Sequence, residues 1–597
     1  MFSLPHTTTA RLTSVLLLSL AFRSCSAAEP VSVTVPATAP SHNVVQSNFL
    51  GISFELSFMD EYFGNDTSTI PPTIINYLAA IRARTGKNPV RIRVGGNSMD
   101  SSTYVPTQTS PMVQLSNTAP NANNQPVDYG PMLWDVLKKV ADDVGGAEYL
   151  VGLSLLDPNN PSVPIIAADA QKALGDSLDG FLLGNEPDLY TGHHNRPNIA
   201  NYTLDLYIDE FRTVSNRLAD TSAGNLLNLR NIGGPTICCA WNLDNVLTDG
   251  YLAAFDNILK YVSVQHYPQN NCFGRHAYEI PYYLQHSNVV RLAAWQQPAI
   301  DIVISNTSSV APKFLMSEFN SASCGGIPGI SETYAVGSIW TVDYALQMAA
   351  VGYTAAFIHT RERGITYNLF TPPEGEDGNS GPWETNPPYY AVLATAEALQ
   401  STDGSIVVDL DIGNSKTDKN SPVGGYAIYD SKGENVLQFA LFNFANASTE
   451  TQSFTLPASA FASSGNKQSV TVKYLSAQDL RQENNIAWGG ESLAGVGDGK
   501  LKADSSTWAA PNQSIDCSNG CSIDVPPVAL AIVFVSGATK INTSQAPGSS
   551  TSNNNGNNNG NNTGNNSAGN SAGRMSPFAN SLIFILWTVG AFYLAAM

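Results

Sequence analysis

Basic side chains are scarce in this chain. Its 597 residues include 30 lysines and arginines against 49 aspartates and glutamates, which gives a formal net charge of −19. Nucleic acid requires basic surface to neutralise its phosphates, so this balance excludes a nucleic-acid-binding protein. It also disfavours a long polyanionic ligand, although a local basic pocket could still hold a single acidic group.

Two kinds of motif are also missing. None of the early strand-like segments is followed by the glycine-rich turn that binds nucleotide phosphates. The cysteines and histidines show no spacing typical of a zinc site. The sequence therefore predicts neither a cofactor nor a metal ion.

Cysteine is rare, with seven residues in the whole chain. Cys517 and Cys521 bracket the turn-rich segment CSNGC, and we expect them to pair with each other in an oxidising compartment. Four further cysteines could form one or two bridges, and the sequence leaves their pairing open: Cys238, Cys239, Cys272 and Cys324.

The N-terminus predicts secretion. In residues 1–27, Arg11 precedes the apolar run LTSVLLLSLAF, and small residues follow, as in a cleavable signal peptide. Sequons for N-glycosylation support an extracellular protein. They lie at Asn65, Asn201, Asn306, Asn446, Asn512, Asn542, Asn561 and Asn565.

The C-terminus predicts a lipid anchor. Residues 541–573 are rich in Asn, Gly and Ser, a composition that cannot bury a core and is typical of a solvated stalk. Residues 574–597 end in the apolar run LIFILWTVGAFYLAAM, which is short for a membrane span and is not followed by basic residues. Small residues, a polar spacer and an apolar tail are typical of a glycosylphosphatidylinositol signal, which is removed. A tail-anchored helix is the alternative. We expect a cell-surface protein that contacts the membrane only through its anchor.

Residues 48–397 alternate short apolar runs with longer segments of helical period. Buried parallel strands joined by crossover helices have this pattern. Eight such units predict a (β/α)₈ TIM barrel rather than an open doubly wound sheet. The predicted strands are 49–56, 89–96, 147–156, 180–187, 231–236, 261–268, 312–319 and 353–360.

Residues 400–540 have a different pattern of apolar and polar residues. Short alternating runs such as VGGYAIYD and QSVTVKYL are divided by Gly, Asn, Pro and Ser, which predicts an antiparallel β-sandwich. The strand-like segment in residues 31–46, VSVTVPATA, precedes the barrel and is expected to join this second domain.

Polar residues gather where the predicted barrel strands end. In such a barrel the carboxyl ends of the strands form one face, on which function collects. The residues at these ends are Glu55, Asn97, Asn185, Glu186, His266, Tyr267, Glu318, His359 and Arg361.

Two of these residues predict chemistry. Glu186 closes the fourth strand in LLGNEPDLYTG, and Glu318 closes the seventh in FLMSEFNSASCGG. A barrel places both at one mouth, and paired carboxyl groups are what glycoside hydrolysis needs. Pro187 prevents the helix from continuing, so it holds the acid at the rim. Asn185 could hydrogen-bond a sugar hydroxyl, and Tyr267 could keep Glu318 ionised by donating to it.

These segments resemble clan A retaining glycosidases and, within them, glycoside hydrolase family 79, the β-glucuronidases and heparanase-like enzymes. RIRVGGNSMD (91–100), QHYP (265–268) and RGITYNLF (363–370) resemble further family segments. The resemblance covers about residues 31–537. It implies a retaining mechanism with Glu186 as acid/base and Glu318 as nucleophile.

The resemblance also implies how the sugar is held. Glu55 and Asn97 would bind hydroxyls, and Tyr367 with nearby backbone amides would bind a glucuronate carboxylate. The ordinary pKa of a histidine would suit His266 to a general base, but the two glutamates already fill both catalytic roles, so we expect His266 to position the substrate. The natural charge partners of the carboxylate are Arg361 and Arg363, unless they pair with Glu362 or another acid.

Two departures from the family pattern leave the acid specificity open. Ser323 stands where heparanase-like members carry a Tyr, with Cys324 next to it, and Gly364 lies three positions before Tyr367. The expected function is a secreted exo-β-glucuronidase that removes terminal glucuronic acid, including its 4-O-methyl ether, from glycans. A retaining β-glycosidase for neutral sugars and a non-catalytic surface glycan-binding protein are the alternatives.

Overall fold

The structure is a computed structural model, and it describes residues 29–116, 125–306, 308–374, 381–446, 450–464, 469–493 and 497–535. The predicted signal peptide, the stalk and the C-terminal tail lie outside these residues, as do Asn542, Asn561 and Asn565. In the described part of the chain, no helix is long and apolar enough to cross a membrane.

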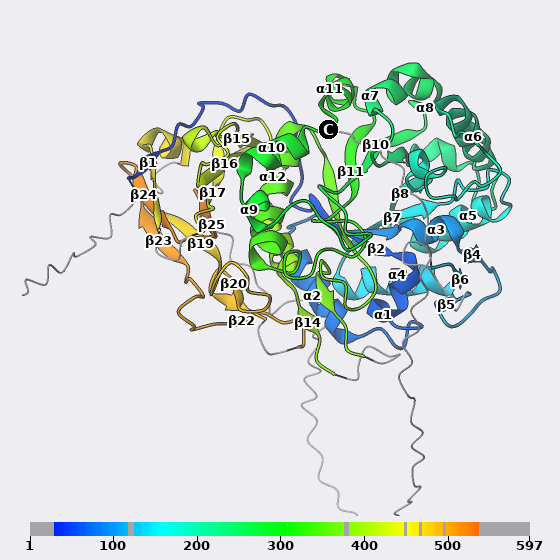
Figure 1. Cartoon of the computed structure of the whole chain (residues 1–597), viewed down its shortest axis with the longest axis horizontal. Helices are drawn as coiled ribbons and strands as arrows, with labels where there is room; N and C mark the ends of the chain where they lie inside the picture. Colours follow the sequence, from blue (N-terminus) through cyan, green and yellow to red (C-terminus); the bar gives the residue numbers. More distant parts are fainter. Residues whose placement is uncertain are drawn as a thin grey trace, which may run out of the picture. The chain divides into compact units, whose positions relative to one another are not determined.

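Eight parallel strands close into a barrel in the N-terminal part of the chain (Figure 1). Each strand falls within or beside a predicted apolar run, and the side chains along most of them are buried. The order around the barrel is the order in the sequence. The strands are β2 (Leu50–Glu55), β3 (Val90–Gly95), β7 (Ala147–Leu153), β8 (Leu178–Leu183), β9 (Ile232–Ile237), β10 (Leu259–His266), β11 (Lys313–Phe319) and β12 (Ala355–Thr360).

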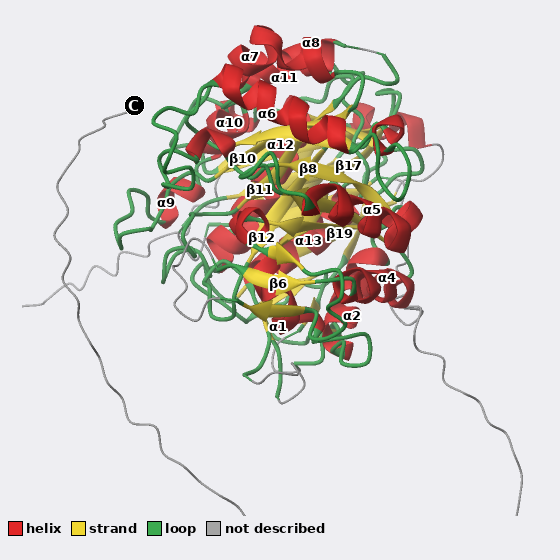
Figure 2. Ribbon diagram, turned by 90° about the vertical axis from the view of Figure 1, so that its right-hand side faces the viewer, coloured by secondary structure: helices red, strands yellow, loops and turns green. Residues whose placement is uncertain are grey.

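Helices lie outside the barrel strands (Figures 1 and 2). Most are amphipathic and turn apolar residues toward the sheet; in α4, for example, Leu133, Val136 and Leu137 are buried. The helices are α1 (Met59–Phe63), α2 (Pro72–Arg82), α3 (Asn97–Ser101), α4 (Met132–Val144), α5 (Ser162–Leu174), α6 (Leu204–Arg217), α7 (Leu243–Val246), α8 (Leu252–Phe255), α9 (Ile280–Tyr283), α10 (His286–Ala293), α11 (Gln297–Ser305), α12 (Thr341–Val351) and α13 (Pro387–Ala398).

Apolar side chains fill the lower part of the barrel interior. Leu150, Leu182, Leu315 and Phe357 form one buried cluster there with Tyr261 and Ala355. Such packing makes the barrel a solid support rather than a pore, so polar chemistry is confined to the strand ends. A small sheet with the order β4-β6-β5 is inserted between β3 and α4; its strands are β4 (Thr103–Tyr104), β5 (Val113–Leu115) and β6 (Val127–Tyr129).

The C-terminal part of the chain forms the predicted β-sandwich. Its larger sheet has the order β15-β16-β17-β25-β19-β20-β21-β22, with β23 paired to β19, and its smaller sheet has the order β1-β18-β24. The N-terminal strand β1 (Val31–Ser32) therefore joins this domain, in parallel with β18. The other strands are β15 (Ser405–Asp409), β16 (Val423–Asp430), β17 (Val436–Asn443), β18 (Gln452–Leu456), β19 (Ser469–Ala477), β20 (Ile486–Trp488), β21 (Glu491–Ser492), β22 (Lys502–Ala503), β23 (Gln513–Asp516), β24 (Cys521–Val525) and β25 (Ala529–Phe534).

The two sheets share a core. Phe454 and Ile523 of the smaller sheet lie in one buried cluster with Phe439 and Val472 of the larger sheet. The predicted disulfide Cys517–Cys521 closes the turn before β24.

A buried glutamate joins the barrel to the sandwich. Glu397 of α13 accepts hydrogen bonds from Arg84 at 2.8 Å, from Lys473 of β19 at 2.6 Å and from the Trp488 indole of β20 at 2.7 Å. A buried carboxylate is tolerated when it is paired in this way, and removing one partner leaves an uncompensated charge. This network fixes the larger sheet of the sandwich against the barrel helices.

Candidate active site

One cavity of about 390 Å³ lies at the carboxyl ends of the barrel strands. It brings together most of the residues that the sequence singled out. The predicted residues that line it are Glu55, Asn97, Glu186, His266, Tyr267, Glu318, Arg361 and Tyr367.

Glu318 of β11 is held from two sides. Tyr267 donates its hydroxyl to Oε1 over 2.8 Å, as predicted, and Arg93 of β3 donates to Oε2. His359 of β12 places Nε2 at 3.8 Å from Oε1. Burial alone would raise the pKa of Glu318, but the interactions with His359 and Arg93 outweigh it and lower that pKa below its ordinary value. Glu318 is therefore ionised at neutral pH.

Glu186 follows β8 and has the opposite electrostatic character. Burial, followed by the nearby charge of Glu318, raises the pKa of Glu186 well above its ordinary value. Its backbone lies in the left-handed region, at φ 48°, between Asn185 and the 3₁₀ turn Pro187–Leu189. A hydrogen bond from its N–H to the carbonyl of Thr236 in β9, at 3.1 Å, fixes this sparsely populated conformation. Glu186 therefore presents a protonated carboxyl to the same cavity.

Asn185 is buried beneath the cavity and does not line it. Its side-chain oxygen accepts from Arg93 at 2.7 Å, and its nitrogen donates to Asn97 at 2.9 Å. The Gln265 amide lies beside it; in the orientation that satisfies its neighbours, it donates to Glu186 at 3.0 Å and accepts from Arg93 at 3.1 Å. The sequence suggested that Asn185 contacts a sugar hydroxyl. That contact stays a prediction. In the structure Asn185 orients Asn97 and lies between Arg93 of β3 and Gln265 of β10, so it links the ends of these strands with that of β8.

Glu55 ends β2 and is also ionised. Ser98 donates to its carboxylate from the backbone N–H at 2.8 Å and from its hydroxyl, and His359 Nε2 lies 3.4 Å away. Burial would raise the pKa of Glu55, but the hydrogen bond and charge interaction with His359, followed by Arg361, lower it to about 2. Gly96 is required beside it, because a Cβ atom there would collide with this carboxylate.

The two candidate arginines lie differently. Arg361 lines the cavity, where its charge acts on Tyr367 and Glu55, although it also pairs with Glu362 at 2.9 Å. Arg363 does not line the cavity, and its backbone N–H donates to Glu61 at 2.7 Å. The cavity therefore has one arginine of the two that the sequence suggested.

His266 lines the wall of the cavity as a neutral ring. It stacks on Trp295 with a centroid distance of 4.1 Å, and burial lowers its pKa to about 4. It cannot carry a positive charge near neutral pH, which agrees with a positioning role.

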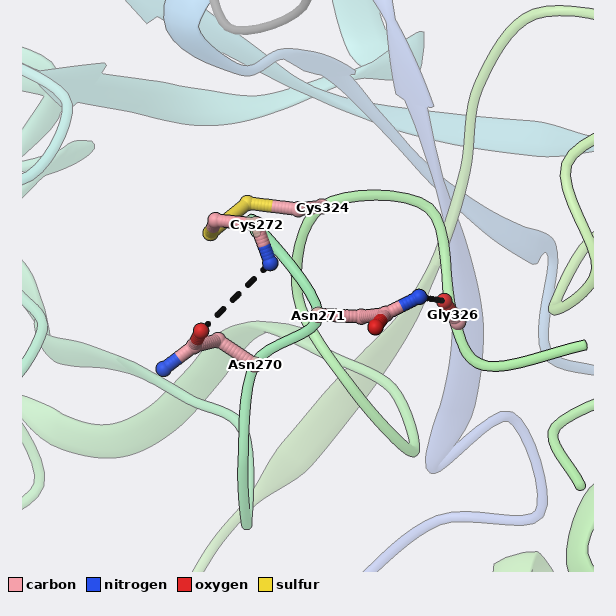
Figure 3. The surroundings of a disulfide bond; sticks show 5 residues. All are labelled: Asn270, Asn271, Cys272, Cys324 and Gly326. Atoms are coloured by element: carbon pink, nitrogen blue, oxygen red, sulfur yellow. Dashed lines mark hydrogen bonds between the residues drawn. A yellow bond between two sulfur atoms is a disulfide. The ribbon is translucent and has the colours of Figure 1, made fainter. Parts of the chain in front are cut away.

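A disulfide anchors the outer rim of the cavity. Cys272 and Cys324 are bonded, which answers the pairing that the sequence left open. Figure 3 shows Asn271 donating to the carbonyl of Gly326 at 2.9 Å beside this bridge, so the two loops are tied together twice. Phe273, with 89% of its surface exposed, follows Cys272 at the mouth.

Arg93 and Gln265 were not among the predicted site residues, and His359 had no predicted role. Arg93 is 1% exposed and contacts Glu318 and Asn185 from the barrel interior. The signal in the sequence was the alternation in RIRV: Ile92 and Val94 lie on one face of the strand, and Arg93 lies on the other, which faces the barrel interior. Within the described residues, no group of three or more His, Cys, Asp or Glu side chains is placed to hold a metal ion.

Comparison with known proteins agrees with the resemblance to glycoside hydrolase family 79. Residues 425–532 match the family described as the glycosyl hydrolase family 79 C-terminal beta domain. No curated protein matches the chain.

Solved structures share the fold. A 4-O-α-L-rhamnosyl-β-D-glucuronidase from Fusarium oxysporum is 21% identical and has a TM-score of 0.63, covering 84% of this chain and 100% of its own. A family 51 α-L-arabinofuranosidase from Bifidobacterium longum is 12% identical and has a TM-score of 0.55; the match covers 84% of this chain and 99% of the arabinofuranosidase. These likenesses show a TIM barrel with an attached β domain.

Proposed function

We propose that the protein is a retaining exo-β-glucuronidase that removes terminal β-linked glucuronic acid from glycans. The observation that carries the proposal is the pair Glu186 and Glu318. Both face one cavity at the carboxyl end of a barrel, and their pKa values are shifted in opposite directions. A protonated acid beside an ionised carboxylate is the arrangement that glycoside hydrolysis uses.

The reaction is a double displacement. Glu318 attacks the anomeric carbon while Glu186 gives its proton to the departing oxygen, which leaves a glycosyl ester on Glu318. Glu186, now ionised, then takes a proton from water, and that water releases the sugar with its original configuration. Tyr267 and Arg93 stabilise Glu318 when it becomes a carboxylate again.

A uronic acid is the preferred substrate because the cavity holds a cation. Arg361 and Tyr367 both line the cavity, and they would bind the carboxylate of the sugar. The structural neighbour from Fusarium oxysporum is named for a substituted glucuronide, which supports glucuronate rather than a neutral sugar. The overall charge of −19 disfavours an endo-acting enzyme that follows a sulfated chain.

The proposal includes secretion and attachment to the cell surface through a lipid anchor. Support comes from the two terminal segments of the sequence and from the two disulfides, which form in oxidising compartments. The sequon residues Asn201, Asn306, Asn446 and Asn512 are exposed, and Asn65 is half-buried.

The test is hydrolysis of 4-nitrophenyl β-D-glucuronide, with the matching glucoside, galactoside and xyloside as comparisons. Glucuronide turnover, with the β-anomer as first product by NMR, is expected, and Glu318→Gln should abolish it. Turnover of a neutral glycoside alone would keep the mechanism and overturn the carboxylate pocket. A folded protein that hydrolyses none of the four, nor a glucuronic-acid-terminated oligosaccharide, would overturn the enzyme assignment.

A further inference from the structure

Two consecutive cysteines line the cavity beside Glu186. Cys238 and Cys239 follow β9 directly; Cys238 is half-buried and Cys239 is exposed. Among the described cysteines they are the two outside disulfide bonds. Their sulfur atoms lie 2.7 Å apart, which is about 0.7 Å longer than a disulfide bond. The mechanism proposed above gives neither of them a role.

Asp188 holds this pair in place. Its carboxylate accepts three consecutive backbone N–H groups, from Cys238 at 3.0 Å, from Cys239 at 2.9 Å and from Ala240 at 2.8 Å. Asp188 lies two residues after Glu186, in the 3₁₀ turn Pro187–Leu189 that follows it. The two cysteines are therefore fixed relative to the carboxyl that protonates the leaving group.

We propose that Cys238 and Cys239 are a redox modification site, at which a disulfide between the neighbouring residues forms a wall of the subsite for the leaving group. The bond closes a small ring whose sulfur edge faces the cavity. The subsite role rests on the proposed function, because Glu186 marks the leaving-group side only if it acts as the acid.

The oxidant is a low-molecular-weight disulfide such as oxidised glutathione. Cys239 attacks one of its sulfurs and releases one thiol, and Cys238 then displaces the second thiol from the mixed disulfide. The cysteines lose two electrons and two protons, and the reagent gains them as two thiols. Exposure suits Cys239 to the attack, and the hydrogen bond from Cys238 lowers the pKa of Cys239.

Closing the ring changes how a leaving group is bound. Two separate thiols become one rigid apolar surface that can pack against a sugar ring, and any thiolate charge next to Glu186 disappears. Oxidation should therefore lower KM for substrates with a sugar as leaving group. It should have little effect on kcat, because neither sulfur touches the anomeric carbon in this arrangement.

The first test is independent of activity. The full chain, purified without reductant, is denatured, alkylated with iodoacetamide and digested for mass spectrometry. The peptide that contains both cysteines should be unalkylated and lighter than the dithiol form by two hydrogens. Alkylation of both cysteines, in protein also exposed beforehand to oxidised glutathione, would overturn the proposal.

The second test measures the subsite. The double variant Cys238→Ser, Cys239→Ser should raise KM for a glucuronyl disaccharide about fivefold, as expected for the loss of roughly 40 Å² of apolar contact. The variant Cys517→Ser, Cys521→Ser, which removes a disulfide in the sandwich, should leave KM unchanged. An unchanged KM in the first variant would overturn the subsite role. Should the double variant not fold, native protein reduced with a phosphine and checked by mass supplies the same comparison. Should the native protein hydrolyse no glucuronide, the proposed function fails while the mass measurement still decides the disulfide.

Discussion

Arg93 of β3 forms an ion pair with Glu318 of β11 inside the barrel, where the Arg93 side chain is 1% exposed. The same guanidinium also donates to Ser53 at 3.1 Å and to Asn185 at 2.7 Å. A buried cation with three fixed acceptors is preorganised, so it favours the ionised form of Glu318 without any rearrangement. Arg93 is therefore part of the barrel interior and also keeps the proposed nucleophile, Glu318, ionised.

Replacing Arg93 should change the pH profile as well as the rate. In Arg93→Gln the pKa of Glu318 should rise, because burial raises this pKa and less positive charge then opposes that effect. Since Glu318 must be ionised to attack, the acidic limb of kcat/KM should move up by about one pH unit. The value of kcat should fall about 10²-fold. Arg93→Lys keeps the positive charge but loses the planar guanidinium, so the acidic limb should move less than in Arg93→Gln. An unchanged acidic limb in Arg93→Gln would show that Arg93 is only structural.

Glu186→Gln should separate substrates by their leaving groups. A proton from Glu186 is needed when the leaving alcohol is a poor one, such as a sugar, and hardly needed for 4-nitrophenolate. The variant should lose about 10² to 10⁴-fold in kcat/KM on a glucuronyl disaccharide and much less on the nitrophenyl glycoside, if glycosylation limits the rate. The basic limb of the pH profile, which reports deprotonation of Glu186, should disappear. Equal losses on the two substrates, as expected for Glu318→Gln, would contradict the acid role.

Arg361 and Arg363 provide a matched test of the carboxylate pocket. Arg361→Gln should lower kcat/KM for the glucuronide about 10- to 100-fold, the value of one charge-assisted interaction, and leave any glucosidase activity unchanged. Arg363→Gln removes the same charge outside the cavity and should have little effect on either substrate. If Arg363→Gln proves the more damaging variant for the glucuronide, the assignment of the pocket is wrong.

The fold and the two carboxylates could be predicted because each depends on local sequence. Buried parallel strands are apolar runs, and Glu186 and Glu318 stand out as the acids that close two of them. The Cys517–Cys521 bridge was predictable for the same reason, since its two residues are four positions apart.

Contacts between distant segments could not be predicted in this way. Arg93 lies 225 positions from Glu318, and nothing within its own strand indicates which acid it meets. Cys272 and Cys324 are separated by 52 positions, and two other cysteines were equally available. Arg361 and Arg363 are two residues apart in one loop, whose backbone path alone decides which of them faces the cavity.

The junction between the barrel and the sandwich should make stability depend on pH. His286 of α10 is buried, and its ring lies 2.9 Å from Asp343 of α12 and 3.3 Å from Asp409 of β15. Tyr426 donates to Asp343, and Lys416 lies 3.6 Å from Asp409. Burial disfavours the charged ring, but the two aspartates outweigh it and raise the pKa of His286 to about 10.

Because this pKa is higher in the folded protein than in the unfolded chain, the charged ring stabilises the fold fully below about pH 6.5. That contribution is lost as the pH rises through the folded value of about 10. The midpoint of thermal unfolding should therefore fall between pH 7 and pH 10, and His286→Gln should lower it at pH 7 and flatten this dependence. His276→Gln, at an exposed site in the loop before α9, should leave the dependence of this midpoint on pH as it is in the wild type. An equal slope in His286→Gln and wild type would mean that groups other than His286 set the stability at alkaline pH.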